Sequence, residues 1–186
     1  MVETDGLLLR QFQDEDWLDV LEYGSQKQVA KAANFTALRT KKDAISFQNI
    51  LRRDGVWAIE EKVSNKVIGN IGLFKIIKPN GLLEKSGYEV GYALNQNFWG
   101  RGLMTKALRK LCDLEKKRGT FFLQARVYSD NLASCKVLQN NGFKLQSQRE
   151  VFDVFLPNKK ISELYYVKIL TREIERSENN AVDERF

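Results

Sequence analysis

The feature that most constrains the fold is a run that passes from strand to helix across a glycine-rich turn. Residues 88–94 have the composition of a strand, residues 98–102 read Phe-Trp-Gly-Arg-Gly, and apolar residues recur at helical spacing from Leu103 to Leu114. The first N–H groups of such a helix lack intrahelical partners, and the helix dipole adds partial positive charge there. The run therefore predicts an anion site, with the rest of the chain as scaffold and substrate surface around it.

The glycine pair alone does not identify the ligand. A dinucleotide fingerprint requires a third glycine where Thr105 stands, and a Walker loop requires Gly-Lys-Ser/Thr, which is missing. Gly100 and Gly102 are thus as compatible with a closely packed helix entry as with a phosphate site. Arg101 favours phosphate, because its guanidinium can form charge-assisted hydrogen bonds with it.

Composition predicts one globular domain. The chain has 186 residues, of which 43% are hydrophobic and 29% charged. It has no apolar run near the roughly 20 residues of a membrane span, and residues 1–6 lack the features of a signal peptide, so we expect a cytoplasmic protein. The formal charge of +6 favours anionic ligands or acidic partners and keeps nucleic acid as a weak candidate.

The chain contains no histidine, which excludes Ser-His, Cys-His and His-metal mechanisms. Proton transfer must then use carboxylates, tyrosine, lysine or water. Cys112 and Cys135 lack metal-type spacing and lie in helical patterns, so we expect buried free thiols. Cys135 is rejected as a nucleophile, because no histidine can activate it.

The order of predicted elements indicates an α/β fold of the α+β type, with a mixed, mostly antiparallel central sheet and helices on both faces. Predicted strands cover residues 7–12, 56–61, 66–74, 88–94, 121–128, 144–155 and 161–170. Predicted helices cover residues 17–21, 26–33, 40–54, 103–118 and 131–141. Residues 82–87 are expected to form a loop, and the polar tail 171–186 a helical stub or a flexible segment.

Several motifs together resemble the GNAT acetyltransferase superfamily. They are residues 6–10 (GLLLR), 88–94 (YEVGYAL), 98–105 (FWGRGLMT), 130–138 (DNLASCKVL) and 141–143 (NGF). The chain looks most like the RimJ/RimL branch, which acetylates N-terminal amines of ribosomal proteins. The resemblance covers about residues 4–170 and implies an N-acetyltransferase domain over residues 1–170.

The resemblance implies acetyl-CoA as the donor and no metal. Backbone N–H groups from Arg101 to Thr105 would hold the pyrophosphate, the pantetheine arm would pair with residues 92–94, and Asn131 would bind cofactor or order its loop. The implied cofactor-binding residues are Tyr92, Ala93, Leu94, Gly100, Arg101, Gly102, Leu103, Met104, Thr105, Asn131 and Ser134. Trp99 and Met104 depart mildly from the superfamily signature, and Lys106 stands where the branch often has an acid.

Acetyl transfer to an amine requires a base, an oxyanion donor and a group that protonates or stabilises the leaving thiolate. Glu89 matches the catalytic glutamate of several members, and a sheet-face ion pair is the alternative. Many members use a tyrosine where Leu138 stands; RimL-like enzymes instead have a serine at the Ser134 position that stabilises the thiolate. Asp153 matches a carboxylate base of the branch or is an exposed strand acid, with Glu150 as the weaker rival.

The resemblance implies an amine acceptor, a protein N-terminus of ribosomal type, acetylated by direct transfer in a ternary complex. A small amine such as a polyamine, amino acid or antibiotic, and a non-catalytic acyl-CoA-binding module, are the alternatives. The fold permits both small and large acceptors. Contact with nucleic acid is expected only through the ribosome, no membrane partner is expected, and the family often forms homodimers.

Overall fold

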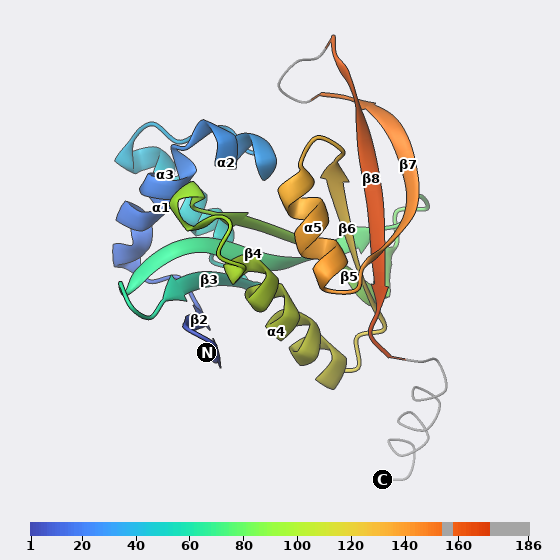
Figure 1. The fold of residues 1–186 in the computed structure, drawn as a ribbon, viewed down its shortest axis with the longest axis horizontal. Helices are drawn as coiled ribbons and strands as arrows, with labels where there is room; N and C mark the ends of the chain where they lie inside the picture. Colours follow the sequence, from blue (N-terminus) through green and yellow to red (C-terminus); the bar gives the residue numbers. More distant parts are fainter. Residues whose placement is uncertain (154–157, 172–186) are drawn as a thin grey trace.

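The computed structural model describes residues 1–153 and 158–171, and within them the strands form one sheet (Figure 1). The strands are β1 (Val2–Thr4), β2 (Leu7–Arg10), β3 (Val56–Glu61), β4 (Lys66–Ile77), β5 (Leu83–Leu94), β6 (Phe122–Tyr128), β7 (Lys144–Phe152) and β8 (Lys160–Ile169). Their order across the sheet is β1-β2-β3-β4-β5-β6-β8-β7. All neighbours are antiparallel except β5 and β6, which are parallel. The predicted mixed, mostly antiparallel sheet is confirmed.

Helices cover both faces of the sheet, as predicted. They are the 3₁₀ turns η1 (Asp14–Asp16) and η2 (Gln96–Phe98), and the α-helices α1 (Trp17–Gly24), α2 (Lys27–Ala32), α3 (Lys41–Leu51), α4 (Leu103–Lys117) and α5 (Leu132–Asn140). One buried cluster joins α4 and α5 to one face, and a second joins α1, α2 and α3 to the other. The apolar stripe of α4, including Leu103, Ala107, Leu108 and Leu111, is buried in the first cluster, as its helical spacing predicts.

The expectation of a loop over residues 82–87 is wrong, because β5 already begins at Leu83. Lys78 and Leu82 close a short turn, in which Lys78 N–H donates to the Leu82 carbonyl at 2.8 Å, and Ile77 then pairs with Leu83. Its two leucines, Leu82 and Leu83, are exposed, and polar residues follow them, so the segment shows no alternating pattern of buried hydrophobic residues. Backbone pairing with β4 makes it a strand despite that composition.

β5 and β6 separate soon after they meet. Their register contains only three pairs, from Gly87–Phe122 to Glu89–Gln124. Beyond Glu89, β5 continues to Leu94 and β6 to Tyr128 without pairing to each other. The sheet is therefore open between the carboxyl ends of these two parallel strands, where ligands of such sheets bind.

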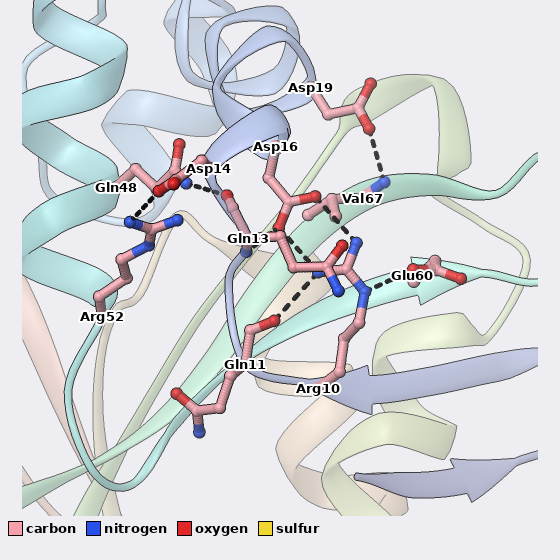
Figure 2. A network of polar contacts seen from close by, with 10 residues as sticks. All are labelled: Arg10, Gln11, Gln13, Asp14, Asp16, Asp19, Gln48, Arg52, Glu60 and Val67. Carbon is pink, nitrogen blue, oxygen red and sulfur yellow. Dashed lines mark hydrogen bonds and ion pairs between the residues drawn. The ribbon is translucent and has the colours of Figure 1, made fainter.

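A buried polar network fixes the start of α1 against the sheet (Figure 2). The guanidinium of Arg10 binds both oxygens of Asp16, at 2.7 and 2.8 Å, and also pairs with Glu60 on β3. Asp19 accepts a 2.8 Å hydrogen bond from the Val67 N–H of β4, and burial raises the pKa of its carboxyl. The network sets the position of α1, and hence of the α2 segment that follows it.

At the termini the structure adds one strand and leaves two predictions untested. β1, which the sequence did not indicate, pairs with β2 from Val2 to Thr4. The hairpin of β7 and β8 is confirmed, but residues 154–157 at its tip and tail residues 172–186 lie outside the described residues. No helix in the described part of the chain is long and apolar enough to cross a membrane.

Candidate active site

The opening between β5 and β6 contains two cavities that meet. The first, the glycine-turn cavity, has a volume of about 340 Å³ and extends from the Gly100–Gly102 turn to α5. The second, the Glu89 cavity, has a volume of about 370 Å³ and lies between β5, β6 and the end of α2. Both are lined by Ala32, Ala33, Tyr92 and Ser134. A molecule in one cavity can therefore reach a molecule in the other at this junction.

The glycine-turn cavity brings together the predicted cofactor-binding residues with one exception. Its lining contains Tyr92, Ala93, Leu94, Gly100, Gly102, Leu103, Met104, Thr105, Asn131 and Ser134. Arg101 is the exception. Val29, Ala32 and Ala33, from α2 and the residue after it, also line the cavity, although the motifs gave no signal for them.

The glycine-rich turn presents free backbone donors to this cavity. Gly100 and Gly102 have φ angles of 73° and 71°, in the left-handed region that glycine adopts without a steric penalty. The first bond inside α4 is donated by the Lys106 N–H to the Gly102 carbonyl, at 3.1 Å. The N–H groups of residues 103–105 precede it and point out of the helix end. They fit a pyrophosphate, as does the dipole of this 15-residue helix.

Arg101 does not contribute its side chain to this cavity. Its guanidinium binds Glu61 on β3, with Nη2 2.6 Å from Oε1, and lies over the ring of Phe98. A side-chain contact from Arg101 to phosphate would require this pair to break. Lys136 on α5 lines the cavity instead and is exposed. Sequence reasoning missed Lys136, because an exposed lysine in a helix carries no motif signal.

The free edge of β5 supplies backbone groups for an extended ligand. Asn95 N–H donates to the Ile68 carbonyl of β4, so residues 95 and 93 face β4, whereas residues 94 and 92 face the opening. The indole N–H of Trp99 already donates to the Leu94 carbonyl at 2.7 Å. Of the three predicted pantetheine partners, Tyr92 and Leu94 thus offer backbone groups to the cavity. The backbone of Ala93 does not.

Two residues at the junction of the cavities, Ser134 and Tyr92, have hydroxyl groups. Tyr92 Oη donates a 3.3 Å hydrogen bond to the Ser134 carbonyl, and burial raises the pKa of the Tyr92 hydroxyl. The phenol is therefore a hydrogen-bond donor throughout the physiological pH range. The motifs indicated a role only for the Tyr92 backbone. Its side chain could have been placed only by knowing that β5 and α5 pack together here.

Asn131 acts as the N-cap of α5 and makes a second contact. Its Oδ1 accepts the Ser134 N–H at 3.1 Å, and its Nδ2 donates to the Ala32 carbonyl at the end of α2, at 3.2 Å. One side-chain amide thus joins the helix that carries Ser134 to the wall shared by both cavities.

Glu89 lines the second cavity, but its carboxylate is already hydrogen-bonded. Arg126 Nη2 lies 2.7 Å from Oε2, and Gln124 Nε2 donates to the same oxygen at 2.9 Å. The bond to Glu89 raises the pKa of the Arg126 guanidinium. Tyr165 completes the chain by donating to Gln124 Oε1 at 2.9 Å. The ion pair envisaged for Glu89 is present, and an approaching amine must compete with these donors for the carboxylate.

Asp153 does not line the cavity that Glu89 and Ser134 share. It follows the end of β7, lines neither cavity, and its backbone N–H donates to the Lys159 carbonyl at 2.8 Å. The alternative expectation of an exposed strand acid is wrong, because Asp153 is only 3% exposed. Its rival Glu150 is exposed and pairs with Lys160. Of the three predicted catalytic residues, the fold brings only Glu89 and Ser134 to a common cavity.

The Glu89 cavity continues over a part of the sheet that the helices leave uncovered. A third cavity of about 470 Å³, the sheet-face cavity, shares Phe74, Glu89, Arg126 and Glu163 with it. The sheet-face cavity extends to β7, where Arg149 binds Glu163 with Nη2 2.6 Å from Oε2. Together the two cavities form a groove from the Ser134–Tyr92 junction across β6 and β8 to β7.

Comparison with known proteins agrees with this geometry. A family model described as an acetyltransferase (GNAT) domain matches residues 6–144. The chain is 30% identical over 181 residues to p20 of Bacillus licheniformis, named as an uncharacterised N-acetyltransferase; the match covers 91% of this chain and 96% of that one.

Two solved structures share the fold. A GNAT-family acetyltransferase from Bacillus anthracis superposes with a TM-score of 0.78 at 22% identity, covering 91% of this chain and 98% of that chain. RimL, named as a ribosomal L7/L12 α-N-protein acetyltransferase and solved with coenzyme A, superposes with a TM-score of 0.72 at 19% identity, covering 89% and 95%.

Proposed function

The chain belongs to the GNAT acetyltransferase family, and on this basis we propose that it transfers the acetyl group of acetyl-CoA to the N-terminal α-amine of a protein or peptide. The observation that supports an extended acceptor is the groove made by the Glu89 cavity and the sheet-face cavity, which share four lining residues. A small amine needs only the junction, whereas a peptide can place its amine there and lie along the groove. The α-N-protein acetyltransferase RimL shares the fold at 19% identity, and we extend its class of acceptor to this chain as a proposal.

The donor fits the glycine-turn cavity. Acetyl-CoA supplies an activated acetyl thioester. In the proposal the N–H groups of residues 103–105 and the dipole of α4 bind its pyrophosphate, and the free edge of β5 at Tyr92 and Leu94 pairs with its pantetheine amides. Lys136 adds positive charge at the same cavity.

At the junction, Ser134 and Tyr92 supply hydrogen-bond donors for the charge that develops as the thioester is broken. We assign stabilisation of the leaving thiolate to these two hydroxyl groups; the single O–H of Tyr92 must turn from the Ser134 carbonyl to donate to the thiolate. The position of the usual family tyrosine is occupied by Leu138, which lines the Glu89 cavity. The ammonium loses two protons on becoming an amide: the first passes to Glu89 and then to solvent, and the second can protonate the leaving thiolate. Neither hydroxyl therefore has to give up its proton permanently.

Glu89 is the carboxylate that we assign to the amine. It lines the Glu89 cavity, and the bonds from Arg126 and Gln124 fix its position. It accepts the proton of the ammonium directly or through a water molecule, which requires the amine to displace or share one of these donors. Asp153 is a second proposal for the base, and it is the weaker one because it lines neither cavity.

The proposal is tested by incubating the protein with acetyl-CoA and a peptide that has a free N-terminus, and by measuring released thiol and the mass of the peptide. The matched control is the same peptide with a formylated N-terminus and an internal lysine. We expect acetylation of the free peptide only. Equal acetylation of both peptides would place the reaction on lysine, and a strong preference for polyamines or amino acids would favour a small-molecule acceptor. If none of these acceptors leads to thiol release, the proposed acetyl transfer is contradicted.

A further inference from the structure

The short helix α2 forms a wall common to both cavities. Val29 lines the glycine-turn cavity, and Ala32 and Ala33 line both this cavity and the Glu89 cavity. Figure 1 shows α2 extending from the side of α1 and α3 toward the start of α5. Any displacement of α2 therefore changes the donor side and the acceptor side of the junction together.

At its N-terminal end, α2 is hydrogen-bonded to the segment that leads into the glycine-rich turn. The side chain of Gln26, the residue before the helix, donates from Nε2 to Asn95 Oδ1 at 2.9 Å and accepts the Gln96 N–H at Oε1 at 2.8 Å. Asn95 is buried and also donates to Glu22 Oε1 at 2.8 Å. Gln26 thus joins α2 by two bonds to Asn95, the residue before η2, and to Gln96, the first residue of η2.

At its other end, α2 is bonded to α5 through the Asn131 amide, which donates to the Ala32 carbonyl and accepts the Ser134 N–H. An ion pair of Lys31 and Asp130 lies beside this contact at 3.1 Å. Both of its side chains are about half exposed, so the pair contributes little. Val29 also packs with Ala93 of β5 in one buried cluster, and the main hydrogen-bonded links of α2 to the cofactor-binding elements are the amides of Gln26 and Asn131.

The helix depends on these links because it has little stability of its own. It contains six residues, has no side-chain cap, and buries Val29 and Ala30. An isolated helix of this length is not stable in water. Its position in the protein must come from tertiary contacts, of which the Gln26 bonds are directed at the cofactor-binding loop.

We infer that α2 couples occupancy of the glycine-turn cavity to the affinity of the Glu89 cavity, and that Gln26 is the positioning residue of this coupling. The inference rests on the proposed function, which assigns the donor to one cavity and the acceptor to the other. A ligand that orders residues 95–105 fixes the position of Gln26 through its two hydrogen bonds. Gln26 in turn fixes the position of α2, and with it the place of Ala32 and Ala33 in the wall of the acceptor cavity. Because coupling between two sites is reciprocal, the acceptor must tighten donor binding by the same factor.

The first test uses coenzyme A alone and measures hydrogen–deuterium exchange of residues 27–34. In the wild-type protein we expect coenzyme A to slow exchange of this segment. In Gln26→Ala the protection should fall about 5- to 10-fold, which corresponds to the loss of one or two neutral hydrogen bonds. Gln28→Ala is the matched control, because Gln28 is exposed on the same helix and lines none of the cavities; it should behave as wild type.

A second variant and a second measurement cover the case in which Gln26→Ala is unstable. Gln26→Glu can still accept the Gln96 N–H but cannot donate to Asn95, so it should lose part of the protection. In calorimetric titrations of an acceptor peptide, coenzyme A should tighten peptide binding to the wild-type protein about 5-fold or more, and less in either variant.

The outcomes separate this inference from the proposed function. Absence of protection by coenzyme A in the wild-type protein, or equal protection in wild type and Gln26 variants, overturns the coupling role of α2 without any acceptor being present. Failure of every peptide to be acetylated overturns the proposed function instead and leaves the exchange result to be judged by itself.

Discussion

Replacement of Tyr92 by phenylalanine tests whether the Tyr92 hydroxyl stabilises the leaving thiolate at the junction of the two cavities. The Tyr92 hydroxyl donates to the Ser134 carbonyl at 3.3 Å, and both residues line both cavities. Tyr92→Phe removes one oxygen atom and keeps the ring, so the packing of β5 against α5 should be preserved. A change in rate can then be attributed to the lost hydroxyl.

The expected magnitudes differ for folding and for catalysis. The bond is long, and the Ser134 carbonyl keeps its normal helical donor within α5, so the free energy of unfolding should fall by only about 0.5–1 kcal/mol. A hydrogen bond to a charged group contributes about 1.5–3 kcal/mol, so loss of a donor to the thiolate should lower kcat about 10- to 100-fold. KM for acetyl-CoA should change little, because the hydroxyl acts as charge develops.

The assay is a steady-state measurement of thiol release for wild type, Tyr92→Phe, Ser134→Ala and the double variant, with unfolding by urea as the folding control. If both hydroxyls stabilise the same thiolate, the double variant should lose less than the sum of the two single effects. A kcat of Tyr92→Phe within twofold of wild type would refute the assignment. So would a loss of rate that only follows a loss of stability.

Three further predictions concern the scaffold of the site. Gly102→Ala and Gly119→Ala both place alanine at a positive φ in open space, so each should lower the unfolding free energy by about 1–2 kcal/mol. Only Gly102→Ala should weaken coenzyme A binding in calorimetry; equal weakening by both would contradict the proposed binding of pyrophosphate at the glycine-rich turn. Asp16→Ala should lower the free energy of unfolding, measured in urea, by about 3 kcal/mol, because buried Arg10 loses its bidentate partner and keeps only Glu60. A decrease below about 1 kcal/mol would show that the network is not needed for stability. Burial raises the pKa of Tyr23 in the folded protein. The protonated phenol therefore contributes its full stabilisation below the pKa of tyrosine in the unfolded chain, near pH 10, and above that pH the free energy of unfolding falls by about 1.4 kcal/mol per pH unit. Between pH 9 and 11 the unfolding free energy of Tyr23→Phe should fall less steeply than that of wild type.

Much of the fold follows from local patterns that the structure confirms. Thr40 is the N-cap of α3 and forms a capping box with Asp43, as its position before an amphipathic run predicts, and Gly119, just after the C-cap of α4, has the left-handed conformation. The polar start of β5 was missed, because backbone pairing rather than side-chain hydrophobicity makes Leu83 a strand residue. β1 was missed for the same reason.

Part of the lining of the glycine-turn cavity could be named from the sequence, because the residues of the turn and of the start of α4 follow one another along the chain. Gly100, Gly102 and the first residues of α4 line this cavity together, and so do Asn131 and Ser134, which the resemblance indicated; their role in cofactor binding stays a prediction. The Arg101 side chain could not be placed, because its partner Glu61 lies 40 residues away in the sequence. The same limit applied to Glu89, whose donors Gln124 and Arg126 come from a neighbouring strand.

The sequence by itself determined the family, the strand–turn–helix unit of residues 88–105, and the exclusion of histidine chemistry, because these depend on residue types at short spacing. Only the tertiary structure decided that β5 and β6 separate after Glu89, that Tyr92 reaches Ser134, and that α2 is bonded to both Asn95 and Asn131. Such contacts join residues between 35 and about 100 positions apart, and they depend on how whole elements pack against one another. For this reason the residues of the proposed donor site could be named from the sequence, whereas the proposed acceptor groove had to be seen in the fold.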